Sequence, residues 1–177
     1  MNDIGFESLR NAIVVRAVDD YCDAVRMLSI LLDKNEAYRR ILLDCKHGRI
    51  PKLHTVEEVE AEILVRIKMQ EDKLEEVERF FNTEWYKNLC PIGSKYMIKK
   101  TKEKSIDDMV NLCIYNLSKV KEKNLHSKRT QKSLRQFEIL KNFLLSDWLK
   151  KLTKRDAESI LQYMKSESNC MFCDFSV

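Results

Sequence analysis

Hydrophobic residues recur along the chain at the spacing of amphipathic helices. Between residues 8 and 33, apolar side chains return every three or four positions, so they share one face of a helix. Residues 35–45 continue the pattern and are predicted to form a second helix. Gly48 and Pro51 then interrupt the pattern and predict a loop, which we interpret as part of an insertion at residues 33–56.

Three further long helices are predicted downstream. Thr55 and Glu58 form a capping box, because a threonine hydroxyl and a glutamate three residues later satisfy backbone donors reciprocally. The helix that begins there is expected to end at about Phe81. Residues 105–123 and 126–145 show the same periodicity and are predicted to form the next two helices.

Both tryptophans lie in near-copies of one short phrase. Residues 80–89 and 143–152 carry identical or similar side chains at matching positions, 63 residues apart, which predicts a partial internal duplication. Trp85 and Trp148 are predicted to be core wedges between a short helix and its neighbours, because large aromatic side chains dominate burial in small helical lobes.

Each phrase is expected to form a helical corner. Thr83 and Ser146 are placed to cap the two short helices that carry the tryptophans. In the second copy, a tight turn at residues 153–156 is predicted to cap a further helix that runs through Met164.

Composition favours an all-α fold. The 177 residues include 44% hydrophobic and 34% charged residues but only three glycines and two prolines, too few for the frequent turns of a sheet. We expect two small helical lobes related by the partial repeat, each ending in a short Trp-bearing helix plus a closing helix. Lobe one (residues 1–101) has the acidic long helix and the inserted loop, lobe two (102–166) has a basic helix junction, and residues 167–177 form a flexible tail.

The chain is expected to be soluble and cytoplasmic. No stretch approaches 18 uninterrupted apolar residues, and Asp3 and Glu7 stand where a secretory signal would carry positive charge. Six cysteines are scattered singly except for the last two, and the first four are interpreted as buried thiols of a cytosolic protein.

Charge is separated along the sequence. Residues 55–84 hold ten acids and four bases, a net charge of −6, whereas residues 95–154 hold sixteen bases and six acids, a net charge of +10. A basic cluster of this kind neutralises phosphates and gains affinity by counterion release, although most charge runs are only solvated helix faces. The candidate binding residues are Lys119, Lys121, Lys123, Lys128, Arg129, Lys132, Arg135, Lys154 and Arg155.

Metal and catalytic motifs are weak or missing. Cys170 and Cys173 form a lone CxxC pair, which supplies two zinc ligands where a closed site needs four. Cys45, His47 and His54 would have to complete it, and nothing in the sequence brings them together, so no metal or other cofactor is predicted. An enzyme is not expected, because the sequence has no nucleophile elbow, glycine-rich phosphate loop, HExxH helix or paired-carboxylate motif.

Residues 146–164 provide a second candidate nucleic-acid element. A short helix, a turn with Lys154 and Arg155, and a second helix follow the order of a helix-turn-helix, whose second helix enters the major groove of DNA. Many helical proteins contain corners of this shape, so the pattern alone is a weak signal.

Parts of the chain resemble a family of small helical proteins carried by prophages and mobile elements of Firmicutes. The resemblance rests on Asn11-Ala-Ile-Val-Val-Arg-Ala-Val-Asp-Asp-Tyr21, on Glu78-Arg-Phe-Phe-Asn-Thr-Glu-Trp-Tyr-Lys-Asn-Leu89 and on Lys95-Tyr-Met-Ile-Lys-Lys100. It covers lobe one apart from the insertion, and only its Trp half recurs in lobe two. The acidic turn that usually follows the Trp helix in the family is replaced by Cys90-Pro-Ile-Gly93. The resemblance implies a mobile-element origin and transfers no catalytic residue; with the polarised charge, it makes the chain similar to type II anti-CRISPR inhibitors.

Three functions of different classes are consistent with these patterns. The leading hypothesis is a non-enzymatic binding protein that inhibits a host defence machine, most specifically a CRISPR effector nuclease or its DNA or RNA, inside the host cell. The rival is a helix-turn-helix phage regulator that binds duplex DNA, and the third is an assembly protein with no nucleic-acid role. None of them needs a small-molecule substrate or a membrane.

Overall fold

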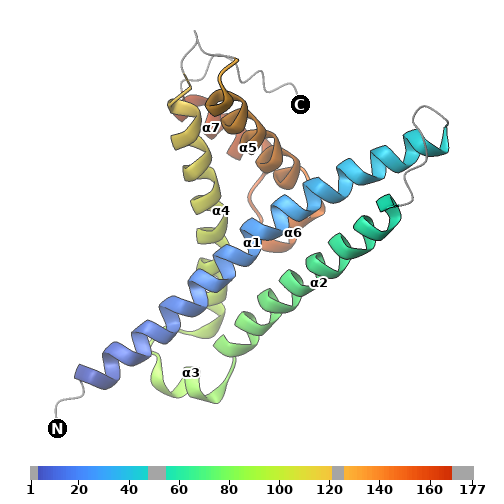
Figure 1. The fold of residues 1–177 in the computed structure, drawn as a ribbon. Helices are drawn as coiled ribbons and strands as arrows, with labels where there is room; N and C mark the ends of the chain where they lie inside the picture. Colours follow the sequence, from blue (N-terminus) through green and yellow to red (C-terminus); the bar gives the residue numbers. More distant parts are fainter. Residues whose placement is uncertain (1–3, 48–54, 121–125, 169–177) are drawn as a thin grey trace. The chain divides into compact units, whose positions relative to one another are not determined.

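The fold is helical throughout the part of the chain that the structure describes. The structure is a computed structural model, and it describes residues 4–47, 55–120 and 126–168. No strand occurs among these residues, which confirms the all-α prediction (Figure 1). The helices are α1 (Ile4–Lys46), α2 (Thr55–Phe81), α3 (Glu84–Leu89), α4 (Ser94–Ser118), α5 (Lys128–Leu144), α6 (Asp147–Leu152) and α7 (Ala157–Ser168).

The chain divides into two compact units. Unit 1 comprises Met1–Ser105 and unit 2 comprises Ile106–Val177. The boundary falls inside α4, so this one helix closes unit 1 and opens unit 2. Each unit therefore has its own core.

Two predicted helix breaks are wrong. The expected separation of residues 8–33 from 35–45 does not exist, because α1 is continuous through both segments. The expected helix start at Ser105 lies inside α4, where the buried Ser105 hydroxyl donates to the Lys102 carbonyl oxygen at 2.8 Å. Neither helix contains an internal proline, and Gly5 is the only glycine inside them, so no residue forces a break.

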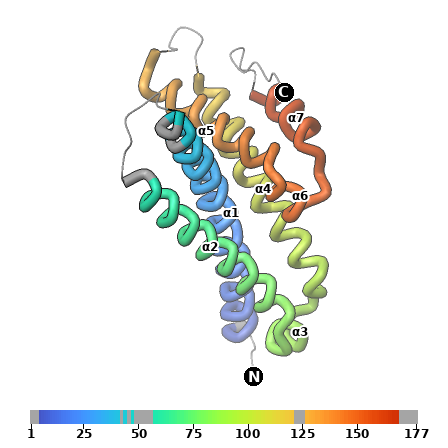
Figure 2. Tube along the Cα trace, turned by 90° about the vertical axis from the view of Figure 1, so that its right-hand side faces the viewer, coloured from blue at the N-terminus to red at the C-terminus, as the bar shows by residue number. Residues whose placement is uncertain are grey.

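The core of unit 1 forms where α1 and α2 pack side by side (Figures 1 and 2). The two helices meet along apolar positions that recur every three or four residues. Gly48 and Pro51, which predict the loop between them, lie outside the described residues. Deeply buried members include Tyr21, Val25 and Leu28 of α1 and Leu74 and Phe81 of α2.

A polar network adds to this apolar packing. Tyr21 donates its hydroxyl to Glu78 Oε1 at 3.3 Å, and the same oxygen lies 2.8 Å from Lys102 Nζ. The network therefore links α1, α2 and the N-terminal part of α4. Burial, followed by the negative charge of Glu78, raises the pKa of Tyr21 far above its usual range.

The core of unit 2 forms from the C-terminal part of α4 with α5, α6 and α7. An amide pair also joins α4 to α5, since Asn116 Nδ2 donates to Gln136 Oε1 at 3.0 Å. Helix α7 extends to Ser168, so the predicted helix end at Met164 and tail start at 167 are wrong; residues 169–177 lie outside the described part. Buried members include Val110, Leu117, Phe137, Phe143, Leu149, Leu161 and Met164.

The tryptophans are not the buried residues of the α2–α3 and α5–α6 corners. Trp85 is 36% exposed and Trp148 is half-buried, whereas the following residues, Tyr86 and Leu149, are only 1% and 3% exposed. The prediction that both tryptophans fill the core is therefore wrong by one position. Thr83 and Ser146 do cap α3 and α6, as predicted.

Candidate nucleic-acid interface

The predicted binding residues that the structure describes all belong to unit 2. Lys119 follows the end of α4, four bases lie on α5, and two lie in the turn between α6 and α7. Lys121 and Lys123 lie outside the described residues, so the predicted junction is only partly visible. The described members are Lys119, Lys128, Arg129, Lys132, Arg135, Lys154 and Arg155.

The bases of α5 share the solvent side of that helix. Its core side carries side chains spaced three or four residues apart, among them Phe137 and Leu140, which turns the bases outward. All four bases are exposed, and three of them recur at the i, i+4, i+7 spacing of one stripe. We call this set the basic α5 face, and it consists of Lys128, Arg129, Lys132 and Arg135.

The start of α5 adds to the positive character of this face. Ser127 caps the helix, because its hydroxyl oxygen accepts from the Thr130 amide at 3.1 Å. The first turn contains no acid that would offset the positive end of the helix dipole. Lys128, Arg129 and Lys132 form no ion pair with any acid that the structure describes.

The net charge of the protein comes entirely from unit 2. Residues 1–105 hold 19 bases and 19 acids, whereas residues 106–177 hold 13 bases and 9 acids. Unit 1 is thus neutral and unit 2 carries the whole formal charge of +4. The basic α5 face supplies four of these 13 bases with no acid between them.

Two aromatic side chains of unit 2 lie next to lysines. Lys119 Nζ lies 5.2 Å from the ring centroid of Tyr115, whose side chain is 60% exposed. Lys151 Nζ lies 4.5 Å from the ring of Trp148. Sequence reasoning did not single out Tyr115 or Lys151, although their spacings of four and three residues from the partner were visible signals.

Arg155 does not belong to the basic α5 face. Its guanidinium forms an ion pair with the carboxylate of Asp107 on α4, so the turn before α7 is tied back to unit 2. Lys154, its neighbour, is exposed. The described members of the predicted set therefore lie in three places: the basic α5 face, the turn before α7 with its paired Arg155, and Lys119 after α4.

The α6–α7 corner differs from a groove-binding helix-turn-helix. Helix α6 has only six residues. The N-terminal end of α7, which would face the DNA, carries Asp156 as its cap, with Oδ2 accepting from the Ser159 amide at 2.9 Å. Glu158 adds a second carboxylate in the first turn. Two carboxylates and a paired Arg155 make this end poorly suited to phosphate or base contacts.

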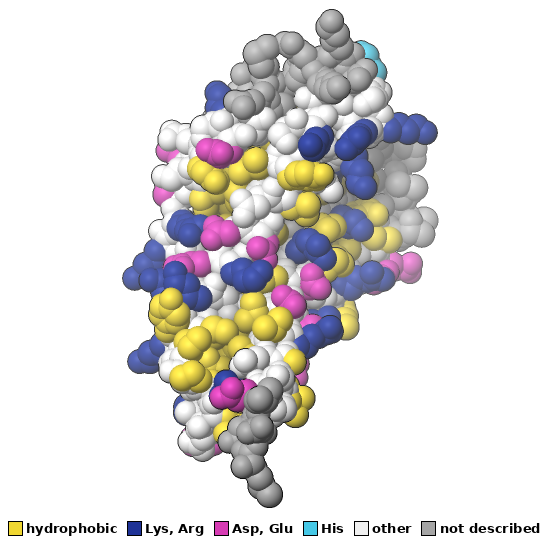
Figure 3. Space-filling view, turned by 90° about the vertical axis from the view of Figure 1, so that its left-hand side faces the viewer, with side chains coloured by type: hydrophobic (Ala, Val, Ile, Leu, Met, Phe, Trp, Pro, Cys, Tyr) yellow, Lys and Arg dark blue, Asp and Glu magenta, His cyan; other side chains and the backbone are white. Residues whose placement is uncertain are grey.

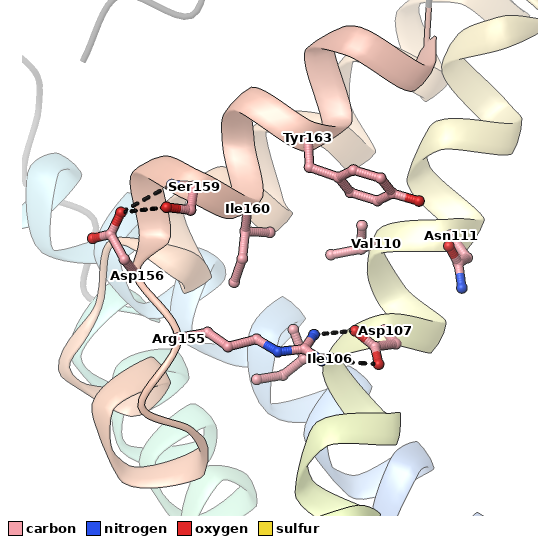
Figure 4. A pocket seen from close by; sticks show the side chains of 9 residues that line it. All are labelled: Ile106, Asp107, Val110, Asn111, Arg155, Asp156, Ser159, Ile160 and Tyr163. Atoms are coloured by element: carbon pink, nitrogen blue, oxygen red, sulfur yellow. Dashed lines mark hydrogen bonds and ion pairs between the residues drawn. The ribbon is translucent and has the colours of Figure 1, made fainter.

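An open hollow lies beside this corner, between α4 and α7. It has a volume of about 530 Å³ and combines apolar, aromatic and polar side chains (Figure 4). The Arg155–Asp107 pair lies at one end and Tyr163 projects across the other. No pattern in the sequence predicted this site, because its two sides lie nearly 50 residues apart.

Part of the acidic stretch of α2 is paired within its own helix. Arg66 lies 2.5 Å from Glu62, and Lys68 lies 2.8 Å from Asp72. The hydrogen bond and charge of Asp72 raise the pKa of Lys68. These i to i+4 pairs are typical of a solvated helix face. Two further acids pair with bases outside α2, Glu60 with Arg39 and Glu78 with Lys102, which offsets part of its net negative charge.

Unit 1 exposes apolar side chains near the N-terminal end of α1. Hydrophobic atoms gather in the lower part of the face drawn in Figure 3. The patch has no feature that would select nucleic acid, so it lies outside the candidate interface. The exposed apolar residues of this part of α1 are Phe6, Leu9 and Ile13, and Trp85 of α3 is also exposed.

The predicted metal ligands are mostly outside the described structure. Cys170, Cys173 and His54 lie there, the side chain of Cys45 is not described, and His47 Nδ1 lies 2.7 Å from a backbone oxygen of α1. Among the described residues, no group of three or more histidines, cysteines or acids is arranged to hold a metal ion. None of the described helices has the length and apolar character needed to cross a membrane.

Comparisons with known proteins do not assign a family. No protein-family model, curated protein or solved structure matches this chain. The resemblance to mobile-element proteins stays a prediction that rests on the segments quoted above. The features that remain for a functional argument are the basic α5 face, the lysine-flanked aromatics and the hollow beside α7.

Proposed function

We propose that the protein is a non-enzymatic binding protein whose unit 2 contacts the phosphates of a nucleic acid through the basic α5 face. The observation that carries this proposal is the face itself: four exposed bases on two helical turns, of which three have no described acid to pair with. Each phosphate that such a face neutralises releases counterions and adds to affinity.

The rest of the chain shows what a merely solvated face looks like. In α1 and α2, exposed arginines and lysines pair with acids three or four residues away, which stabilises the helix by about 0.2–0.5 kcal/mol per pair. Lys128 and Lys132 instead place two like charges at i and i+4, which costs a similar amount. Helix stability does not explain this arrangement, whereas a polyanionic partner does. The paired examples are Arg16–Asp20, Arg26–Asp23, Arg40–Glu36, Arg66–Glu62 and Lys68–Asp72.

The biological setting of this binding follows from the resemblance to mobile-element proteins. In that setting the protein inhibits a host defence machine, such as a CRISPR effector nuclease, by occupying its guide or target nucleic acid. The duplex-binding regulator is the weaker proposal, because the helix that would enter the groove begins with Asp156 and Glu158.

The test compares two variants that change net charge equally. One carries Lys128→Glu, Arg129→Glu, Lys132→Glu and Arg135→Glu; the control carries Lys34→Glu, Lys87→Glu, Lys95→Glu and Lys99→Glu, four exposed lysines of unit 1. Fluorescence anisotropy with labelled 12-nucleotide RNA and DNA at two salt concentrations measures affinity and its salt dependence. Helix content measured by circular dichroism verifies that both variants fold.

The two variants should separate cleanly. Reversal on α5 should abolish binding and lower the salt slope by about one per lost phosphate contact, whereas the control should lose only the weaker effect of net charge. Equal losses in both variants would reduce the proposal to a general charge effect. Undiminished binding by the α5 variant would show that the face is only solvated. A DNA-cleavage assay of a CRISPR effector, with the same pair of variants, then tests whether the protein inhibits such a nuclease.

A further inference from the structure

The hollow between α4 and α7 has an apolar floor. Val110 of α4 and Ile160 of α7 form it, and both are core residues, only 4% and 7% exposed. Ile106, fully buried, extends the floor along α4. An apolar floor with a few polar groups around it is typical of a site for a small ligand that is partly apolar.

The two ends of the hollow have different chemistry. Tyr163 extends from α7 toward α4 at one end, and its side chain is 51% exposed, so its ring is open to contact (Figure 4). The Arg155–Asp107 pair at the other end is about half-exposed, which leaves part of the guanidinium accessible. Asn111, an exposed amide on the rim near Tyr163, offers both donors and an acceptor.

We propose that this hollow accepts one unpaired base of a single-stranded nucleic acid. A base stacks on Tyr163, presents its polar edge to Asn111 and lies over the apolar floor. A base within a duplex is stacked on both faces and is not available to such a site. This inference rests on the proposed function, because it specifies which form of nucleic acid unit 2 prefers.

The surroundings favour a nucleotide over an apolar side chain of a partner protein. Two carboxylates, Asp107 and Asp156, line the hollow at its Arg155 end, but unit 2 as a whole carries the net positive charge. Two further aromatics of unit 2, the exposed Tyr115 and the half-buried Trp148, each lie beside a lysine. Proteins that bind single strands combine aromatic platforms for bases with cations for the backbone. A purely apolar partner would gain nothing from these lysines.

Tyr163→Ala tests the inference, with Tyr163→Phe as the matched control that keeps the ring. The probes are a fluorescein-labelled 12-nucleotide oligothymidylate and a 12-base-pair duplex. Loss of one stacked base should weaken oligothymidylate binding by about tenfold in Tyr163→Ala, leave Tyr163→Phe within about twofold, and leave duplex binding unchanged. Both substitutions are at an exposed position, so the fold should survive.

Photocrosslinking gives a second readout that does not depend on affinity. A 12-nucleotide oligothymidylate carrying 5-iodouracil should attach to Tyr163 of the wild-type protein, and mass spectrometry locates the linked peptide. Crosslinking only to other residues, or equal oligothymidylate binding by Tyr163→Ala and wild type, would overturn the proposed base site. The proposed function would still stand, and the hollow could then bind a peptide instead. A wild-type protein that binds neither probe would instead overturn the proposed function.

Discussion

The two tryptophan corners share their backbone contacts. At the α2–α3 corner, the Thr83 hydroxyl donates to the Phe80 carbonyl at 2.7 Å; at the α5–α6 corner, the Ser146 hydroxyl donates to the Phe143 carbonyl at 2.6 Å. The residue after each tryptophan is the buried one. The two phrases therefore form the same local corner, while their origin by duplication stays a prediction.

The surroundings of the two corners differ. In unit 1 the corner is an aromatic cluster, with Phe80 and Trp85 centroids 5.7 Å apart and Phe81 and Tyr86 centroids 5.2 Å apart. In unit 2 the corner is basic, and Lys151 lies over the ring of Trp148. The two units therefore share the backbone structure of the corner, whereas the side chains around it differ and determine what each corner can bind.

The largest expected effect comes from truncating the buried residue of each corner. Tyr86→Ala should lower the free energy of unfolding of unit 1 by about 3–5 kcal/mol, and Leu149→Ala should lower that of unit 2 by about 2–5 kcal/mol, because each leaves a cavity. The chain has one tryptophan per unit, so Trp148→Phe and Trp85→Phe backgrounds give a fluorescence reporter of each unit during urea unfolding.

Substitution of the tryptophans themselves provides the matched control. Trp85→Ala and Trp148→Ala are made in the wild-type background, and their unfolding is measured by circular dichroism. Each should lower the free energy of unfolding by less than the truncation one position later, because both rings are partly exposed. If the tryptophan variants lost more free energy of unfolding than the Tyr86 and Leu149 variants, the tryptophans would be the main core residues of the corners. A shift of both reporters by one truncation would show that the units unfold together.

Most of the helices could be predicted from the sequence, but which individual side chains point into the core could not. The long helix over residues 55–81 and the caps Thr83 and Ser146 follow from spacing and capping rules and are confirmed. Whether Trp85 or the adjacent Tyr86 points inward could not be predicted, because a six-residue helix is too short for a period to define its buried side.

The candidate site could be predicted only where it is local. The bases of α5 are close in sequence, so their clustering is apparent from the order of residues alone. The ion pair of Arg155 joins residues 48 positions apart, and the hollow that it borders depends on the packing of α4 against α7. Sequence periodicity carries no information about which helices meet, so neither feature could be predicted from it.

A smaller effect should distinguish the units at high pH. The pKa of Tyr21 is raised in the folded state, so folded unit 1 holds this proton while the unfolded chain loses it above about pH 10. The stability that Tyr21 contributes is therefore complete below pH 10 and is lost as pH rises further, by about 1.4 kcal/mol at pH 11.

Tyr21→Phe isolates this contribution. The variant should lose less stability than wild type between pH 9 and 11 when Trp85 reports on unit 1, because phenylalanine has no proton to release. The reporter Trp148 should give the same pH response in both proteins if the effect is confined to unit 1. Identical pH profiles at Trp85 would mean that Tyr21 ionises as readily in the folded chain as in the unfolded one.

The smallest effect tests whether the two caps are equivalent. Thr83→Ala and Ser146→Ala should each cost about 1 kcal/mol, because each removes a side-chain acceptor for a helix amide and a donor to the preceding carbonyl. The reciprocal exchanges, Thr83→Ser and Ser146→Thr, keep the hydroxyl and should stay within about 0.5 kcal/mol of wild type. Urea unfolding with the reporter of each unit measures all four. The two caps differ in one detail: Thr83 accepts from the amide three residues later, and Ser146 from the amide two residues later. If only one alanine variant loses much free energy of unfolding, the two corners have the same shape but their caps contribute differently to stability.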